Sequence, residues 1–344
     1  MSEVLKEYLA YRKKKAFLLG GVLLFLSVAA AVALQIGSSG FTLREAFRDE
    51  AARFILWNIR TPRVLGAIFA GGGLAIAGAV MQGLLRNPLA DPFTLGVSHG
   101  AALGAAIAIL LFGAGTTHSS AADAVVVNNP YLVVVFAFLF AMLTSLAILA
   151  LSVLGGISAE GIVLAGVALG SVLTAATVML QYFASDVQIA AIVFWTFGDL
   201  GRISGRELLI ILTVFLVCFS YFYLKRWDYN TAALGDEAAK GLGVNINRAR
   251  LAGMFFSSLL TASVVAFLGI IGFMGIISPH IVRRLVGGDN RFVLPGSVLV
   301  GGLLLLLADT FGRTVIAPVV LPVGAVTSFL GAPMFLYLLL KTRR

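Results

Sequence analysis

Residues 226–250 read RWDYNTAALGDEAAKGLGVNINRAR and form a long polar interval deep between apolar blocks of the chain. A short helix is expected inside this interval. Glycine can open it, two acidic residues fall in its first turn, a lysine lies near its end, and a glycine stops it. These residues are, in order, Gly235, Asp236, Glu237, Lys240 and Gly241.

The same helix would carry a narrow apolar stripe. Leu234, Ala238 and Leu242 recur every four residues, so they share one face of a helix. A helix this short is unstable alone in water and needs a supporting surface. The interval therefore predicts a docking helix. The alternative is a solvated loop that joins two membrane spans.

Composition excludes an ordinary soluble domain. The chain has 344 residues, of which 60% are apolar and 12% charged, and its mean hydropathy is +1.00. Soluble domains carry about 25% charged residues. No alternating pattern of a membrane β-barrel is present. The single Cys218 allows no disulfide framework, and the net charge of +9 bears on membrane orientation and anionic lipid before nucleic acid.

Apolar segments near the length of about 20 residues needed to cross a bilayer recur along the chain. Residues 1–344 are therefore predicted to be one all-α, polytopic transmembrane domain with about ten spans. A short or interrupted helix, broken by Gly275 and Pro279, is expected as the eighth span. The other nine are residues 16–36, 64–85, 93–112, 131–154, 161–183, 208–224, 251–272, 292–308 and 322–340.

The charged loops predict the orientation. Of the 25 Lys and Arg residues, the ten-span topology places 17 on one side with both termini, and 8 on the other. The positive-inside rule puts both termini in the cytoplasm of a cell membrane. A cleavable signal peptide is the alternative for the start, because Ala31-Val32-Ala33 resembles a cleavage site. Its apolar run is too long, and more membrane segments follow.

Two segments are predicted to lie on the outer membrane face. Residues 41–57 mix aromatic and charged side chains irregularly, as in a helix at the interface. Residues 187–198 are too short to cross and carry Trp195 and Phe197 between two aspartates, which suits an interfacial or re-entrant helix.

Motifs for catalysis and metal binding are not found. The chain has no phosphate-binding loop of the G-x-x-x-x-G-K-[ST] type, so it cannot hydrolyse ATP by that device. His99, His118 and His280 are dispersed and have no metal-ligand spacing. We expect packing or hydrogen-bonding roles for His99 and His280, not haem ligation.

Four long strings carry a family resemblance. They are RTPRVLGAIFAGGGLAIAGAVMQGLLRNPLADPFTLGVSHG from residue 60, LGDEAAKGLGV from residue 234, GFMGIISPHIVR from residue 272 and LPVGAVTSFLGAPMF from residue 321. In their order and residues they resemble the FecCD-type permeases, the membrane subunits of type II ABC importers for iron-siderophores, haem and vitamin B12. The resemblance covers nearly the whole chain.

This resemblance implies a permease similar to that of the vitamin B12 importer. It would pair with a second copy, forming a homodimer with the pathway along its axis. Two ATPase subunits would bind ATP and Mg in the cytoplasm, and an extracytoplasmic substrate-binding protein would dock above. No cofactor is expected on this chain. The helix at Leu234 to Val244 is similar to the family's coupling helix, which sits in a cleft of the ATPase.

Two stretches are implied to line the pathway. Asn87, Pro88, Leu89 and Ala90 match the family's turn near the inner mouth. Any inside turn between two spans favours Asn and Pro, which is the alternative interpretation. The fifth and tenth spans offer small or weakly polar side chains that would hold cargo loosely, and helix packing in lipid prefers the same types. Among them Gly166, Thr174 and Thr177 are predicted pathway residues.

Three arginines match the family's basic positions for docking the binding protein. Arg60, Arg63 and Arg313 are expected at the outer surface, where exposed cations would attract carboxylates of that protein. The alternative is that they anchor helix ends in the headgroups. Asp309 lies one turn before Arg313 and is expected to pair with it, not to relay protons.

The cargo is not determined by these strings, which the family shares. We expect an iron chelate, either a ferric siderophore or haem. The alternatives are a corrinoid such as cobalamin, or an oxyanion. An ATP-independent secondary transporter would need buried ionisable groups for ion coupling, and a membrane enzyme would need paired carboxylates or a metal cluster. The sequence offers almost none of these.

Overall fold

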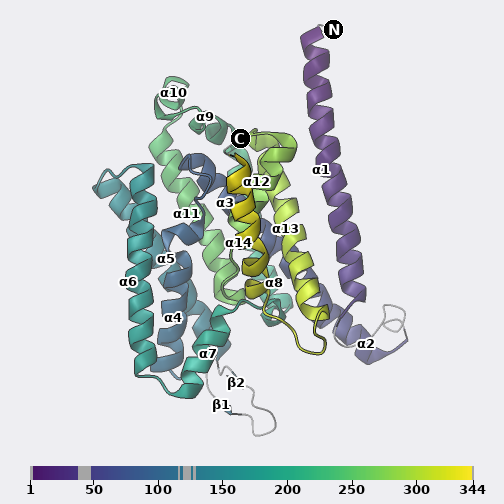
Figure 1. Ribbon diagram of the computed structural model, residues 1–344, viewed down its shortest axis with the longest axis vertical. Helices are drawn as coiled ribbons and strands as arrows, with labels where there is room; N and C mark the ends of the chain where they lie inside the picture. The colour runs from purple at the N-terminus through teal and green to yellow at the C-terminus, as the bar shows by residue number, and fades with distance from the viewer. Residues whose placement is uncertain (1–2, 38–47, 115–116, 119–124, 127–128, 343–344) are drawn as a thin grey trace.

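The computed structural model describes residues 3–37, 48–114, 117–118, 125–126 and 129–342, and it is a bundle of helices (Figure 1). Among these residues, seven segments are long and apolar enough to cross a membrane. They are α1 (Glu3–Gln35), a continuous segment ending in α3 (Thr61–Leu84), α5 (Pro130–Leu154), α6 (Ala159–Tyr182), α8 (Gly205–Leu224), α11 (Ile246–Leu268) and α13 (Asn290–Thr314). The polytopic, all-α prediction is confirmed.

Three further helices take the places of the remaining expected spans. They are α4 (Val97–Leu111), α12 (Met274–Val286) and α14 (Val323–Thr342). Helices α4 and α12 have 15 and 13 residues, so each extends only about 20 Å, less than the hydrocarbon thickness of about 30 Å. The eighth span is short, as expected, but α12 runs unbroken through Gly275 in its first turn and Pro279 in its interior, so the predicted interruption there is wrong. The third span is shorter than predicted.

Non-helical backbone precedes both short helices. Before α4 lies the 3-10 helix η3 (Pro92–Leu95), which ends where Gly96 adopts a positive φ of 77°. Before α12, the chain from Gly269 to Phe273 has no regular secondary structure, and both of these residues have a positive φ. Leu95 and Ile271 are fully buried in these segments. Such backbone is tolerated at membrane depth only where protein surrounds it.

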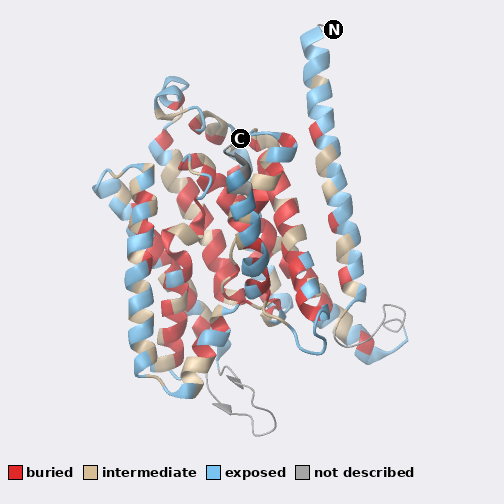
Figure 2. Ribbon diagram, in the orientation of Figure 1, coloured by how far each residue is buried: buried red, intermediate tan, exposed pale blue. Residues whose placement is uncertain are grey.

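Helix α3 is the centre of the bundle. Of its most apolar stretch 83% is buried, against 11% for α1 and 17% for α6, and Figure 2 shows the same contrast between the interior and the two flanking helices. Glycine makes this close packing possible. A Cβ at Gly78 would collide with the carbonyl oxygen of Gly275 in α12, and one at Gly71 with that of Gly301 in α13. The Gly and Ala content of α3 therefore sets the helix spacing.

The polar interval folds into α9 (Arg226–Ala232) and α10 (Asp236–Gly241). The predicted short helix is confirmed, with Gly235 before its first residue at a φ of 112°. Both helices lie at one end of the bundle, which we call the α10 end, and both termini lie toward that end (Figure 1).

The opposite end, the α7 end, carries the segments expected at the outer face. There α2 (Glu50–Ile55) and a π-helical turn (Leu56–Arg60) run directly into α3, while residues 41–47 of the expected surface helix lie outside the described residues. Helix α7 (Asp186–Thr196) has 11 residues and does not cross, as expected. It is followed by the short turn η4 (Leu200–Arg202), and β1 (Thr117–His118) pairs antiparallel with β2 (Val125–Val126) nearby.

Two separate glycine-to-alanine variants in α3 test its contact with α12. Gly78→Ala should destabilise the protein by at least about 1–3 kcal/mol, because the new methyl group meets backbone that cannot move aside. Gly83→Ala in the same helix is the control. Its Cβ would meet nothing within 4 Å, so we expect no loss of stability. Thermal unfolding of the two purified variants in detergent measures the difference, and equal midpoints would contradict this account.

Candidate functional site

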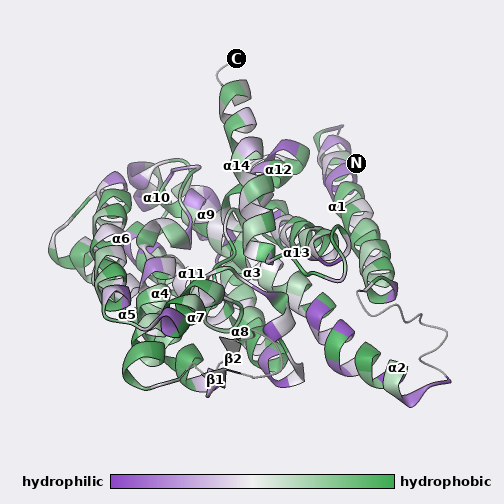
Figure 3. Cartoon of the chain, turned by 60° about the horizontal axis from the view of Figure 1, so that its bottom comes forward, coloured by the Kyte–Doolittle hydropathy of each residue, from purple (hydrophilic) through white to green (hydrophobic). Residues whose placement is uncertain are grey.

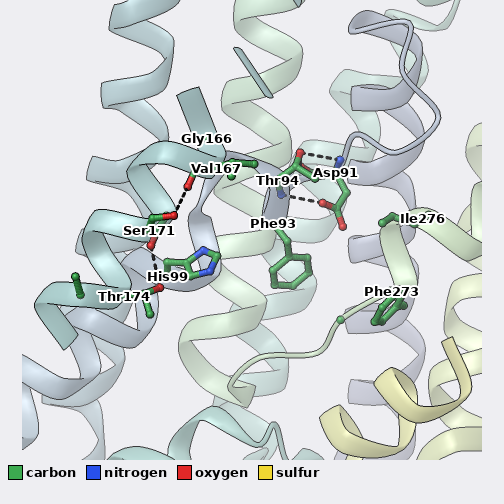
Figure 4. A pocket seen from close by; sticks show the side chains of 13 residues that line it. Asp91, Phe93, Thr94, His99, Gly166, Val167, Ser171, Thr174, Phe273 and Ile276 are labelled. Carbon is green, nitrogen blue, oxygen red and sulfur yellow. Dashed lines mark hydrogen bonds between the residues drawn. The ribbon is translucent and has the colours of Figure 1, made fainter. Parts of the chain in front are cut away.

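A cavity of about 780 Å³ opens on one side of α6 (Figure 4). Its walls come from the α3–α4 connection with η3, from α4, from α6 and from the start of α12. The lining residues are Asp91, Phe93, Thr94, His99, Gly166, Val167, Gly170, Ser171, Thr174, Ala175, Gly272, Phe273 and Ile276. Both non-helical segments described above thus border the cavity.

Local sequence explains why α6 lies so close to η3. Asp91 caps η3 by accepting a hydrogen bond from the backbone N–H of Thr94 at 2.9 Å. A Cβ at Gly166 would collide with the carbonyl oxygen of Thr94, so only glycine allows this approach. At Gly170 a Cβ would lie 3.1 Å from Nδ1 of His99. The predicted pathway residue Gly166 is therefore buried and serves the packing of the cavity wall.

The hydroxyl groups of the wall are already occupied. Ser171 donates to the carbonyl oxygen of Val167 at 3.0 Å, and Thr174 donates to that of Gly170 at 2.9 Å. Both bonds stay within α6, so no hydroxyl hydrogen is directed into the cavity (Figure 4). Such a wall contacts a ligand mainly through methyl groups and rings and gives it few directed hydrogen bonds.

The predicted pathway residues are only partly brought together. Gly166 and Thr174 line the cavity, whereas Thr177 does not, and its hydroxyl donates to Leu173 at 2.9 Å. Sequence reasoning missed the aromatic residues Phe93 and Phe273 and did not assign His99 to the wall. Phe93 and Phe273 could have been found from their positions in the strings that resemble the FecCD-type permeases, where they directly follow Pro92 and Gly272.

The turn at residues 87–90 is rigid. The Oδ1 atom of Asn87 accepts from the backbone N–H of Leu89 at 2.9 Å, and its carbonyl oxygen accepts from that of Ala90 at 3.1 Å. Pro88 fixes the chain between them. Leu89 is 39% exposed, whereas Ala90 is fully buried. The turn leads directly into Asp91 at the cavity wall. Its role as an inner gate stays a prediction.

The apolar stripe of α10 is uncovered in the chain alone. Leu234 is 68% exposed, Leu242 is 63% exposed and Ala238 is exposed, whereas Ala239 on the opposite face is fully buried. Glu237, Lys240 and Gly241 are also exposed. Leu234 precedes Gly235, whose φ of 112° separates it from the helix, so the prediction of one helix face is wrong for Leu234, whereas Ala238 lies in α10 and Leu242 at its end. The docking role stays a prediction.

Asp236 anchors α10 to the bundle. Its carboxylate lies 3.2 Å from Nη2 of Arg250 in α11 and 3.6 Å from Nη2 of Arg86. Arg86 directly precedes the turn at Asn87. An ionic connection between α10 and the turn that leads to the cavity wall therefore exists in the structure, and sequence reasoning did not foresee it.

Two of the three predicted docking arginines, Arg63 and Arg313, meet around one carboxylate at the α7 end, and Arg60 binds the end of α1 there. Asp309 is 1% exposed and lies 2.8 Å from Nη2 of Arg63 and 2.9 Å from Nε of Arg313. The expected pair of Asp309 with Arg313 is confirmed. Arg60 donates from Nη1 to the carbonyl oxygens of Leu34 and Gln35 at 3.0 and 3.1 Å.

The expectation that these arginines are exposed is wrong for this chain. Arg60 is 6% exposed, Arg313 is 4% exposed and the side chain of Arg63 is 13% exposed. The reason is that the last carbonyls of α1 and the carboxylate of Asp309 take up guanidinium donors, and Arg313 also donates to Ile36 at 3.0 Å. The docking role itself stays a prediction.

Comparisons with known proteins match nearly the whole chain to one family of transport proteins. Residues 22–341 match the FecCD transport family. A protein of Methanocaldococcus jannaschii, provisionally named an ABC transporter permease, is 51% identical over 98% of both chains. The hemin transport system permease protein HmuU of Yersinia pestis is 37% identical, covering 96% of this chain and 98% of its own.

Further relatives carry names for other cargo. The Fe(3+)-citrate import permease YfmE of Bacillus subtilis is 37% identical over 94% of this chain and 93% of its own, and the vitamin B12 import permease BtuC of Escherichia coli is 35% identical over 94% and 95%. A solved inward-facing structure, provisionally assigned to the metal-chelate type of ABC transporter, has a TM-score of 0.83 and 31% identity. It covers 95% of this chain and 99% of that chain.

The buried carboxylate at the α7 end should be essential for stability. Asp309→Asn removes the charge that two buried guanidinium groups share, and breaking such a pair costs about 3–5 kcal/mol. The control is Asp199→Asn, which removes the same charge 3.7 Å from Arg63 at a side chain that is 42% exposed. There we expect a loss below about 1 kcal/mol. Thermal unfolding in detergent compares them, and a harmless Asp309→Asn would refute the shared-carboxylate account.

Proposed function

The chain belongs to the FecCD transport family, and we propose that it forms the pathway for an iron chelate, a ferric siderophore or haem. At the coarser level, it is an ABC importer permease of the family that serves iron chelates, haem or vitamin B12. This is a family of transport permeases and not of enzymes. The cavity beside α6 is the observation that carries the proposal, because its wall is large, mostly apolar and poor in directed donors.

A second copy of the chain is proposed to close the pathway. Helix α6 is largely exposed, and its apolar residues Leu164, Val172 and Met179 are 71%, 64% and 69% exposed. The cavity lies beside this open helix and is walled by this chain on one side only. Two copies that meet along α6 would enclose a path between two such walls, with the two cavities facing each other.

The α10 end is proposed to face the cytoplasm and two ATPase subunits. Leu234, Ala238 and Leu242 are apolar and exposed within and at the ends of α10, which suits seating in a cleft of another protein. Asp236 would transmit movement of α10 to Arg86 and the turn that borders the cavity. ATP and Mg would belong to those ATPases.

The α7 end is proposed to face outward and receive a substrate-binding protein. Arg60, Arg63 and Arg313 lie near Asp309 and the half-exposed Asp199, and Arg202 also interacts with Asp199, so positive charges outnumber the carboxylates there. A carboxylate of the binding protein would complement this excess. Because the guanidinium groups are largely buried, they would contribute mainly through their field and not through exposed ion pairs.

An iron chelate is preferred over the other cargo on family breadth. Cobalamin, another corrinoid or an oxyanion would need the same architecture. The relatives named for hemin, Fe(3+)-citrate and vitamin B12 are about equally identical in sequence to this chain, so identity does not separate these cargo types. An ATP-independent secondary transporter is disfavoured, because Asp309 is engaged by two arginines and is unavailable for ion coupling. Binding assays on the partner binding protein with each ligand class separate the cargo types.

Coupling through α10 is tested by a charge in the apolar stripe. Ala238→Asp should abolish ATP-dependent uptake of a ferric siderophore into proteoliposomes that contain the permease, its ATPase and its binding protein. A carboxylate cannot enter an apolar seat without a partner. Ala233→Asp makes the same change at an exposed alanine outside the stripe and should preserve most uptake. Normal uptake by Ala238→Asp would favour the solvated-loop interpretation.

The pathway assignment of α6 is tested by thiol labelling. In a background with Cys218→Ser, Thr174→Cys should react with a small water-soluble thiol reagent, because Thr174 lines the cavity. Labelling should change with the nucleotide state of the ATPases. Ala141→Cys is the control, since this residue of α5 is fully buried and should stay protected. Protection of Thr174→Cys in every nucleotide state would place this face of α6 in packing and not in the pathway.

A further inference from the structure

Lys15 of α1 is a nearly buried ammonium group at the α10 end. The residue is 7% exposed, and its Nζ lies 3.7 Å from the ring centre of Tyr11 and 5.2 Å from that of Phe292. It donates a hydrogen bond to the hydroxyl of Tyr11. Among the residues that the structure describes, no carboxylate lies within 4 Å of this ammonium group.

This environment leaves the charge of Lys15 uncompensated. An ammonium group has three donors, and the structure gives it one acceptor. Aromatic rings attract a cation but carry no net charge. A buried cation is costly unless an anion pairs with it, so the site lacks an anionic partner.

The neighbouring charges increase this deficit. Arg12 lies over the ring of Tyr8 at 5.8 Å, and Arg291 donates to the hydroxyl of Tyr8 at 2.9 Å. The nearby carboxylate of Asp289 already accepts from Arg291 at 2.6 Å and from Asn230 at 3.0 Å. Lys15 and Arg291 both lie over the ring of Phe292, and Arg12 and Arg291 both lie over that of Tyr8. We call Arg12, Lys15 and Arg291 the cationic cluster; among the described residues, only Arg291 of the three has a carboxylate partner.

The cationic cluster lies at the level of the lipid headgroups. The apolar part of α1 runs from Ala16 to Gln35, about 20 residues or roughly 30 Å, which matches the hydrocarbon thickness. Lys15 is the first residue beyond it. Figure 3 colours the start of α1 hydrophilic and the remainder of the helix largely hydrophobic. A phosphate at the edge of the bilayer would meet the cluster at this depth.

The helix is also open to lipid on its side. Only 11% of its apolar stretch is buried, and α1 flanks the bundle with little cover (Figures 1 and 2). On the face of α1 that carries Arg12, Ala16 is exposed and Leu23 is 51% exposed. An acyl chain could lie along these side chains while its headgroup reaches Arg12 and Arg291.

We propose that the cationic cluster binds the phosphate of an anionic phospholipid at the α10 end of the membrane. Lys15 supplies the buried charge, while Arg12 and the partly exposed Arg291 approach the headgroup from the water side. A free phosphate ion offers the same chemistry, but the boundary position and the exposed apolar side of α1 favour a lipid. The bound lipid would fix the start of α1 against α13.

Native mass spectrometry of the purified full-length protein tests this site. Phosphatidylglycerol and phosphatidylcholine with the same acyl chains are titrated in detergent, in separate series. The samples equilibrate near 0.15 M ionic strength and are then exchanged into a volatile buffer. At this ionic strength the nonspecific attraction between lipid and protein charges is screened over about 8 Å. We expect one phosphatidylglycerol to bind in preference to phosphatidylcholine. Lys15→Gln should weaken that binding about fivefold, the effect of one cation at a membrane surface.

The matched control is Lys14→Gln, which removes the same charge at an exposed neighbour and should leave binding unchanged. Equal losses in the two variants would reduce the site to a diffuse positive surface and overturn the proposal. Displacement of the lipid by millimolar inorganic phosphate would overturn the lipid assignment, and equal binding of both lipids would overturn the role of charge. If Lys15→Gln does not fold, Arg12→Gln makes the same test at an exposed member of the cluster.

Discussion

The need to satisfy every backbone polar group inside a membrane governs this structure. Helices α4 and α12 are too short to cross, so the chain must enter each through non-helical backbone. That backbone is held by close glycine contacts, Gly166 against η3 and Gly324 against the carbonyl oxygen of Ile270, which keep it within protein. The same two segments border the cavity beside α6. The cavity therefore exists where the membrane helices are incomplete.

One chain of contacts connects the cavity to the α10 end. Asp236 binds Arg250 and Arg86, Arg86 precedes the turn at Asn87, and that turn leads into Asp91 at the wall. These links are short and mostly polar in an otherwise apolar bundle. An apolar stripe without Asp236 could still bind a partner, but it would have no ionic connection to the wall.

Helix α1 is attached to the bundle differently from the central helices. Its middle is scarcely covered, and polar contacts concentrate near its two ends. At the α7 end, Arg60 and Arg313 bind its last carbonyl groups, and Asp309 keeps Arg313 in place. At the α10 end, Lys15 and Arg291 hold it among aromatic rings. Polar and ionic contacts thus attach α1 to the bundle, whereas close glycine packing attaches α3.

The sequence by itself determined the fold class, the positions of most spans and the short helix of the polar interval, because these depend on local hydropathy, helix length and capping. It also placed Arg313 beside Asp309, since that pair is one helical turn apart. Only the tertiary structure decided that Arg63, 246 residues away from Asp309, shares the same carboxylate, and that the arginines are largely buried. It also decided that Thr174 faces the cavity whereas Thr177 does not, and that Lys15 is buried while Lys14 is exposed. Neighbouring residues of one helix differ in this way because their environment is set by which other helix packs against each face, and that information is not local.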